Sequence, residues 1–407
     1  MDYEIVRLPY EIGSDADYIN AFDKCMRTYK KWVAGLFEDR NGIATQLSIT
    51  EKQRIINAIR TDGGIIKNCI SRYYAGDIAT ATKRIGSLLE RIILDDKNGF
   101  IKSDIDKNYC SRLCANYPFL NINLSSEQIK RMLDNELTFF RARKEYFTDY
   151  SEMYHIPLDK RDLVGTERFS VPGIPCLYLG TSVYDVWLEM GRPAYSDFNV
   201  SAIKLTEKGK KMQILNLVAT PYLLLGLNSP IGDENNMDSN LSIIKSLLRI
   251  YPLVIATSIR NKSPRGKFRS DYIISHLIML NLKKLGIDGV AYLSKRILSS
   301  EEDIVLPQMV NVAFPAFESS SVNEKYGEIC EKIQITRPAN YEEFLSLELG
   351  SAECLNKNSY FAKTFDDNQN LYSCVNRVKI SGKDVVYQNT GFYRFENHLC
   401  EQKFYKL

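Results

Sequence analysis

Histidine and tryptophan are scarce in this sequence of 407 residues, which contains three histidines and two tryptophans. Nine cysteines are present, but there is no repeated CxxC pair, and only Cys110 and Cys114 lie close together. A structural zinc site needs four ligands, and no second pair with matching spacing supplies the other two. We therefore expect free thiols and no bound metal.

Long apolar segments are also missing. No run of residues approaches the roughly 20 apolar positions that a membrane-spanning helix requires, since 222–227 and 253–256 are only of core length. The N-terminus has no apolar leader of the cleavable kind. The formal net charge of +3 is too small to indicate a nucleic-acid or membrane partner. Together with free thiols, these absences favour a cytoplasmic globular protein without membrane association.

The first third of the chain has a helical pattern. Apolar residues recur at spacings of three and four in 18–37 and 81–94, as they do along one face of a helix. A further helix is predicted from Thr50 to Ile59, with the Asp-Gly-Gly sequence at 62–64 ending it. Another is predicted at 128–137. These patterns predict a helical domain over residues 1–134.

Near residue 138 the pattern changes to alternating strands and helices. Strands are predicted at 138–143, 175–180, 287–293 and 309–314, because these runs are rich in β-branched and aromatic residues. Helices are predicted from Ser182 to Gly191 and from Ser270 to Leu285, the second ended by Gly286. We therefore expect an α+β domain at 135–338. An accessory region, 339–407, is expected to contain a helix at 341–349 and strands at 384–387 and 391–395.

Five motifs in the middle segment carry polar residues in a recognisable order. They are Arg141 in FFRAR, Arg168 in ERFSVPGIP, Tyr178 in LYLG, Glu189 in WLEM and Ser294 in GVAYLSKR. In order and context they resemble the RES domain family, named for arginine, glutamate and serine, whose members are bacterial NAD-consuming toxins. This chain departs from the family where Glu167 and Ser170 replace the usual glycine and asparagine, and where Leu188 replaces alanine. Residues 201–267 match little of the family.

The resemblance implies an ADP-ribosyltransferase-like α+β fold in which NAD lies in a cleft between small, split β-sheets. Nicotinamide is a cationic leaving group in NAD, so breaking its bond to ribose requires mainly that positive charge developing at C1′ be stabilised. Glu189 is the candidate catalytic carboxylate for that task. A solvated glutamate at a helix end is the alternative interpretation.

Arginines are the candidate phosphate ligands, because a guanidinium can bond two oxygens at once. Arg141 and Arg143 share one face of their predicted strand, and spacing alone does not choose between them, although the family context favours Arg141. Arg168 is a second phosphate candidate. For all three, a surface ion pair is the alternative.

Two further side chains complete the expected site. The Tyr178 ring is expected to stack against nicotinamide, with a core tyrosine as the alternative. Ser294, at the end of a strand, is expected to bond a phosphate or the nicotinamide amide. The basic loop Arg260, Lys262, Arg265, Lys267 and Arg269 either steers an anionic ligand or is simply solvated.

These features predict an NAD-degrading toxin or antiphage effector that cleaves the nicotinamide–ribose bond by hydrolysis or phosphorolysis. An ADP-ribosyltransferase using the same cleft and an inactive nucleotide-binding sensor are the alternatives. The N-terminal helices resemble the HEPN-related region found ahead of some RES domains. HEPN ribonucleases need an Arg-x4-His motif, and no histidine precedes His155. We therefore expect this region to bind an antitoxin or other regulatory protein, or to form a homo-oligomer.

Overall fold

The computed structural model describes residues 6–38, 46–107, 134–218, 237–264, 266, 268–296, 310–317, 325–348, 377–380 and 382–407. Cys110, Cys114 and the apolar run at 222–227 lie outside these residues, as does most of the helix predicted at 128–137. Cys25, Cys69, Cys176, Cys330 and Cys400 are buried free thiols. In the described part, no helix is long and apolar enough to cross a bilayer, and no group of three metal-ligating side chains is found.

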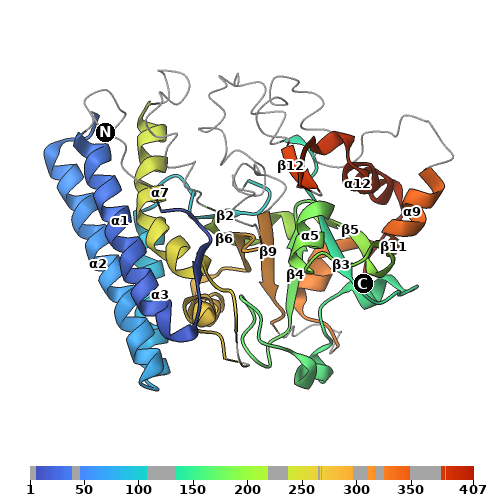
Figure 1. Ribbon diagram of the computed structural model, residues 1–407, viewed down its shortest axis with the longest axis horizontal. Helices are drawn as coiled ribbons and strands as arrows, with labels where there is room; N and C mark the ends of the chain where they lie inside the picture. The colour runs from blue at the N-terminus through green and yellow to red at the C-terminus, as the bar shows by residue number, and fades with distance from the viewer. Residues whose placement is uncertain are drawn as a thin grey trace.

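A layer of helices forms one side of the molecule (Figure 1). It contains α1 (Tyr18–Glu38), α2 (Ile49–Tyr74), α3 (Ile78–Asp95), α7 (Met237–Ser258) and α8 (Ile273–Met279). Their buried side chains form one continuous apolar core. Within it, the hydroxyl of Tyr29 in α1 donates to the Leu248 carbonyl of α7 at 2.7 Å. Helices from both sides of the predicted boundary at residue 134 therefore share a core, while the domain limits themselves stay a prediction.

Helix α2 corrects one sequence-based prediction. The Asp-Gly-Gly sequence at 62–64 was expected to end a helix, but α2 continues through it to Tyr74. A Cβ atom on Gly63 would lie 2.7 Å from Cε of Met26 in α1, so glycine permits the close approach of the two helices. Asp62 is 1% exposed and pairs with Arg91 and Arg249. This packing outweighs the helix propensity cost of about 1 kcal/mol per glycine.

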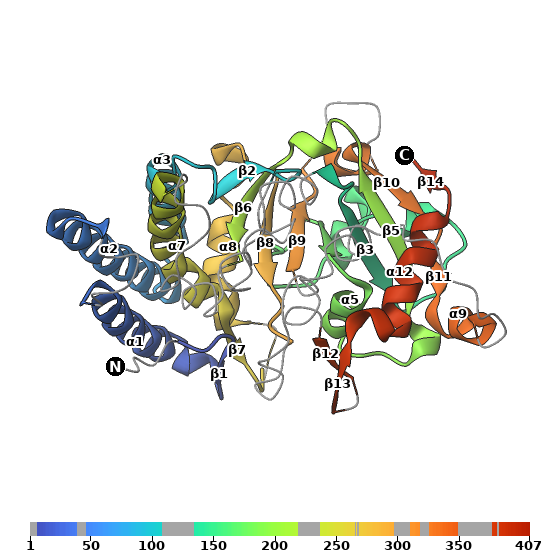
Figure 2. The same ribbon diagram turned by 90° about the horizontal axis from the view of Figure 1, so that it is seen from above.

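Ten of the described strands form a mixed sheet that runs through the middle of the molecule (Figure 2). All neighbouring strands are antiparallel except β6 and β8, which are parallel. The order is β14 (Phe404–Tyr405), β10 (Ile333–Thr336), β5 (Asn199–Leu205), β3 (Thr138–Arg143), β4 (Cys176–Gly180), β9 (Val310–Pro315), β8 (Gly289–Leu293), β6 (Gln213–Leu217) and β2 (Lys102–Asp104), with β11 (Ala339–Asn340) beside β5. The predicted α+β class is confirmed.

The two halves of this sheet meet at a single position. Between β3 and β4 the register contains one pair, Phe140 and Gly180, whereas β3 pairs with β5 along its whole length. β3 and β4 are therefore joined at one position within a single ten-stranded sheet. A separate parallel pair joins β1 (Tyr10–Ile12) to β7 (Ile259–Asn261).

Helices α5 (Val183–Glu189), α9 (Tyr341–Glu348) and α12 (Gly391–Glu401) lie on the side of the molecule away from the helical layer (Figures 1 and 2). The prediction of a strand at 391–395 is wrong, because this segment begins α12, whose N-cap Thr390 accepts a hydrogen bond from Tyr393 N. Phe392, Phe395 and Leu399 are all buried. Their spacing of three and four places them on one helical face.

Apart from the helix predicted at 128–137, whose described residues 135–137 are not helical, the other helix and strand predictions agree with the described residues. Ser182 caps α5 by accepting from Asp185 N at 3.0 Å. The helix predicted at 270–285 is a 3-10 turn (Ser270–Tyr272), then α8, then a second turn (Lys283–Leu285) that ends at Gly286, whose φ is 61°. Ser270 bonds Asp15 through its N–H and hydroxyl, which ties this turn to the chain ahead of α1. A hairpin forms between β12 (Arg377–Ile380) and β13 (Lys383–Val386).

His155 is buried and bonded at both ring nitrogens. Gly327 N donates to its Nε2 at 2.9 Å, and its Nδ1 lies 2.7 Å from the Ile156 carbonyl oxygen. Because a backbone N–H only donates, Nε2 is the acceptor and Nδ1 the donor, so both bonds require the neutral ring. Burial lowers the pKa of His155 from 6.5 to about 4.

This arrangement predicts a loss of stability in acid. Between pH 6.5 and 4 the unfolded chain protonates His155 and the folded protein does not, so the free energy of unfolding falls as the pH falls. From pH 7 to pH 5 the histidine contributes a loss of about 2 kcal/mol. Urea unfolding of the wild type and of His155→Gln at pH 7 and pH 5 measures this loss of stability. The variant should lack the contribution, because glutamine does not titrate in this range. An equal loss in both proteins contradicts the prediction.

Candidate functional site

A cavity of about 440 Å³ lies beside the point where β3 and β4 separate. Its volume is within the range of about 300–1,000 Å³ that is usual for small-molecule sites. Four of the six residues predicted from the motifs line it, namely Arg141, Arg168, Tyr178 and Glu189. They come from β3, the turn before β4, β4 itself and the end of α5. Arg143 and Ser294 are not in the lining.

Arg141 is a cation with no carboxylate partner among the described residues. Its Nη1 donates to the Tyr178 carbonyl at 3.1 Å and its Nη2 to the Tyr154 carbonyl at 3.3 Å. Its Nε is buried and has no hydrogen-bond partner in the part of the chain that the structure describes. Burial, with the nearby charge of Arg143, lowers the pKa of Arg141 to about 9. The guanidinium is thus still charged at neutral pH, and a partly buried charge without a carboxylate partner among the described residues favours an anionic ligand.

The structure distinguishes Arg141 from Arg143, which the spacing in the sequence left as equal candidates for the phosphate ligand. Arg143 Nη2 donates to the Tyr154 carbonyl at 2.8 Å, so both side chains do lie on one face of β3. However, the Arg143 guanidinium lies over the Phe147 ring, 5.6 Å from its centroid, and only Arg141 reaches the cavity.

Tyr178 stabilises the turn that contains Arg168 through hydrogen bonds of its hydroxyl group. Its hydroxyl accepts from Phe169 N at 3.2 Å and lies 2.7 Å from Ser170 Oγ. Ser170, one of the departures from the family pattern, therefore holds this turn against β4. The Tyr178 side chain lines the cavity, and burial raises the pKa of its hydroxyl well above the usual value, so it remains protonated.

Arg168 is a buried cation of the lining, 7% exposed. Its guanidinium carbon lies 5.1 Å from the centroid of the Phe169 ring and 4.8 Å from that of Tyr292. Nη1 donates to the Leu293 carbonyl at 2.7 Å, and Nε has no hydrogen-bond partner within the described ranges. The two rings and this bond fix the guanidinium, and burial lowers its pKa.

Glu189 shares a hydrogen-bond donor with a second carboxyl group. Asn311 Nδ2 donates to Glu189 Oε1 and to Asp185 Oδ1, each at 3.2 Å. Asp185 is fully buried. Burial, and then the charge of Glu189, raise the pKa of Asp185 well above its usual value. This favours the neutral form of Asp185, and Glu189 is the one of the two that lines the cavity.

Sequence reasoning missed Asp185 and Asn311. The signal for Asp185 was its position four residues before Glu189, one helical turn away on the same face. Asn311 had no local signal, because only the pairing of β9 with β4 brings it to the end of α5.

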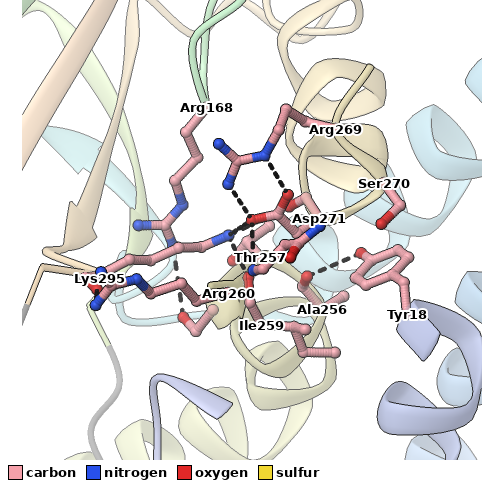
Figure 3. A network of polar contacts seen from close by, with 12 residues as sticks. Tyr18, Arg168, Ala256, Thr257, Ile259, Arg260, Arg269, Ser270, Asp271 and Lys295 are labelled. Carbon is pink, nitrogen blue, oxygen red and sulfur yellow. Dashed lines mark hydrogen bonds and ion pairs between the residues drawn. The ribbon is translucent and has the colours of Figure 1, made fainter. Parts of the chain in front are cut away.

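A polar network around Asp271 forms another part of the cavity wall (Figure 3). Arg269 donates to Asp271 through Nε and Nη2, both at 3.0 Å. Nζ of Lys295 lies 3.5 Å from Asp271 Oδ2 and also donates to the carbonyls of Ile259 and Asp271. Burial alone would raise the pKa of Asp271, but Lys295 and Arg269 hold it below its usual range. Burial, with the charge of Arg168, lowers the pKa of Lys295.

Ser294 acts within its own turn. It is 3% exposed, and its Oγ accepts from Arg296 N at 3.1 Å. The turn carries Lys295 and Arg296, which both line the cavity. Ser294 thus orders the segment that presents these bases, while the contact with a ligand stays a prediction.

The lining is strongly basic. Two of its residues are acidic, Glu167 and Glu189, and seven are basic: Arg141, Arg168, Arg260, Lys262, Arg269, Lys295 and Arg296. The predicted basic loop supplies three of these bases, and its Arg265 and Lys267 lie outside the described residues. Glu11 of β1 pairs with Lys262 and lies 3.9 Å from Arg260. The excess of positive charge suits an anionic ligand.

Comparison with known proteins yields one informative similarity. No protein family matches the chain, so the resemblance to the RES family depends on the motifs alone and stays a prediction. No solved structure matches it. The chain is 30% identical over 232 residues to "Putative toxin YopC" of Bacillus subtilis (strain 168). The alignment covers 56% of this chain and 51% of that protein, so the chain spans about half the length of the relative. It is therefore similar to a protein whose name describes a toxin.

Proposed function

We propose that this chain is a toxin that cleaves the nicotinamide–ribose bond of NAD. One observation carries the proposal: Arg141, which has no carboxylate partner among the described residues, and Glu189 line the same cavity. A dinucleotide needs a cation for its phosphates, and cleavage of the glycosidic bond needs an anion near C1′. The similarity to a protein named as a toxin supports the biological part of the proposal.

The basic residues of the cavity lining would bind the phosphates of NAD. Arg141 has an unused Nε and no carboxylate partner in the described part of the chain, so a pyrophosphate would supply the missing acceptor. Arg168, which lies against the rings of Phe169 and Tyr292, also has an Nε without a hydrogen-bond partner among the described residues. Charge-assisted hydrogen bonds to phosphate are among the stronger polar contacts in proteins. The Tyr178 ring offers a flat surface for nicotinamide.

The Glu189 carboxylate would promote cleavage of the nicotinamide–ribose bond. As the C1′–N bond breaks, nicotinamide leaves with the electron pair as a neutral molecule, and positive charge develops at C1′. Glu189, oriented by Asn311, stabilises this charge and contacts the ribose hydroxyls. A water oxygen then bonds to C1′ and releases its proton, giving ADP-ribose. If phosphate is the acceptor, its oxygen forms that bond instead.

Transfer of ADP-ribose to a macromolecule is the principal alternative, since it uses the same bond cleavage. NAD labelled in its adenylate half separates these fates. We expect the label in small products only, with nicotinamide released in equal amount. Label on protein or nucleic acid would indicate a transferase, and NAD that binds without being consumed would indicate a nucleotide sensor.

The proposed toxicity is tested in cells. Induction of the wild-type chain is expected to arrest growth and to deplete cellular NAD, and induction of Glu189→Ala at equal protein level is expected to do neither. Growth arrest with NAD unchanged, or equal toxicity of both proteins, would contradict NAD cleavage as the cause. We further propose that the helical layer is where an antitoxin or regulatory protein binds.

A further inference from the structure

Helix α12, from the C-terminal region, packs against the helix that carries Glu189. The Phe392 ring of α12 lies 5.5 Å from the Tyr184 ring and 5.3 Å from the Trp187 ring of α5, between centroids. The cavity is lined by other positions of α5, including Val186 and Glu189. Helix α5 is thus held on one face by α12 and faces the cavity with another.

One side chain of α12 reaches the first turn of α5. Glu396 is 0% exposed, and its Oε1 accepts from Val183 N at 2.7 Å and from the Tyr387 hydroxyl. The first N–H groups of a helix have no partner within the helix, so an acceptor from outside must satisfy them. Ser182 Oγ serves Asp185 N, and Glu396 serves Val183 N from more than 200 residues away in the chain.

We infer that Glu396 is a positioning residue for Glu189. Helix α5 has seven residues, with Val183 first and Glu189 last. A helix this short moves largely as a unit, so the bond that fixes its start also fixes the position of the carboxylate at its end. The C-terminal region thereby acquires a role at the cavity without contributing to its lining. The inference rests on the proposed function in assigning Glu189 to catalysis.

Two substitutions of Glu396 test the bond itself. Glu396→Leu removes the acceptor at similar size, whereas Glu396→Gln keeps a carbonyl oxygen that accepts from Val183 N. We expect Glu396→Leu to lower kcat for nicotinamide release at least tenfold with KM changed less than twofold. Glu396→Gln should restore kcat to within about threefold of wild type, because the conservative side chain preserves the contact.

A matched control separates positioning from general loss of packing. Phe395 is the buried residue that precedes Glu396 in α12. The Phe395 ring packs on the rings of Phe344 and Tyr341 in α9, at 4.9 Å and 5.2 Å between centroids. Phe395→Leu should lower the melting temperature but leave kcat of the folded protein near wild type. A fall in kcat equal to that of Glu396→Leu would overturn the inference, as would a Glu396→Leu protein with wild-type kcat.

Tryptophan fluorescence gives a reading that does not depend on turnover. The chain has two tryptophans, so Trp32→Phe leaves Trp187 of α5 as the only one. We expect Glu396→Leu to shift the Trp187 emission and Phe395→Leu to leave it unchanged. An unshifted spectrum in Glu396→Leu overturns the inference, whereas a wild-type protein that releases no nicotinamide counts against the proposed function alone. If Glu396→Leu does not fold, the rate of hydrogen exchange at the Val183 amide of the wild-type protein tests the inference instead. Fast exchange would show that this amide is not held by Glu396 and would overturn the inference.

Discussion

Glu189→Gln is expected to lower kcat for nicotinamide release by about 100- to 1,000-fold, the usual effect of removing one electrostatic group that acts on the transition state. Glutamine keeps the size of the side chain and an oxygen that accepts from Asn311 Nδ2, but it lacks the negative charge that opposes the charge at C1′. NAD affinity should change only a few fold. Single-turnover kinetics and calorimetric titration with NAD measure the two effects separately.

The matched control is Glu343→Gln, because Glu343 is an exposed glutamate of α9 that does not line the cavity. This variant should keep wild-type kcat and NAD affinity. If Glu189→Gln retains kcat within tenfold of wild type while folded, Glu189 is not the catalytic carboxylate. The opposite split, with NAD affinity lost and kcat retained, would make Glu189 a binding residue instead.

Arg141→Met is expected to abolish NAD binding without destabilising the protein. The Arg141 side chain is partly buried, and it has no carboxylate partner among the described residues. Replacing such a charge with an apolar side chain of similar length removes its desolvation cost but also two hydrogen bonds to carbonyl oxygens. Because these effects oppose each other, the free energy of unfolding should change by less than about 1 kcal/mol. NAD affinity should fall at least about 100-fold, since charge-assisted bonds to the phosphates are lost.

Arg143→Met is the control for this prediction, because the two side chains share the Tyr154 carbonyl as acceptor but only Arg141 lines the cavity. Calorimetric titration with NAD and urea unfolding of both variants test it. We expect Arg143→Met to bind NAD within about threefold of wild type. Equal loss of affinity in both variants, or a large loss of stability in Arg141→Met alone, would show that Arg141 is not the phosphate ligand.

The errors in predicting the fold arise where tertiary packing overrides a local signal. The Gly63–Gly64 pair reads as the end of a helix, yet contact with Met26 and the ion pairs of Asp62 extend α2 through it. Residues 391–395 read as a strand because they are aromatic, but their apolar spacing matches a helix packed on α5 and α9. The capping signal of Ser182 before α5 is confirmed, because it depends only on neighbouring residues. Ser270, expected to begin a helix, instead bonds Asp15 with its hydroxyl and does not cap its turn.

The candidate site was predictable where its residues sit in short motifs. Arg141, Arg168, Tyr178 and Glu189 were chosen from such motifs, and all four line one cavity. The surrounding groups were not predictable, because distant segments supply them. Asn311 comes from β9, Lys295 follows β8, and Glu396 belongs to α12. Their places depend on strand pairing and helix packing, which leave no mark within a few residues of sequence.

Incubation of the purified wild-type protein with NAD, with free nicotinamide and remaining NAD both quantified, tests the central claim most directly. The account predicts that nicotinamide appears in the same amount as NAD disappears, and that this stops in both Glu189→Gln and Arg141→Met. A folded wild-type protein that binds NAD in its cavity but leaves it intact would contradict it.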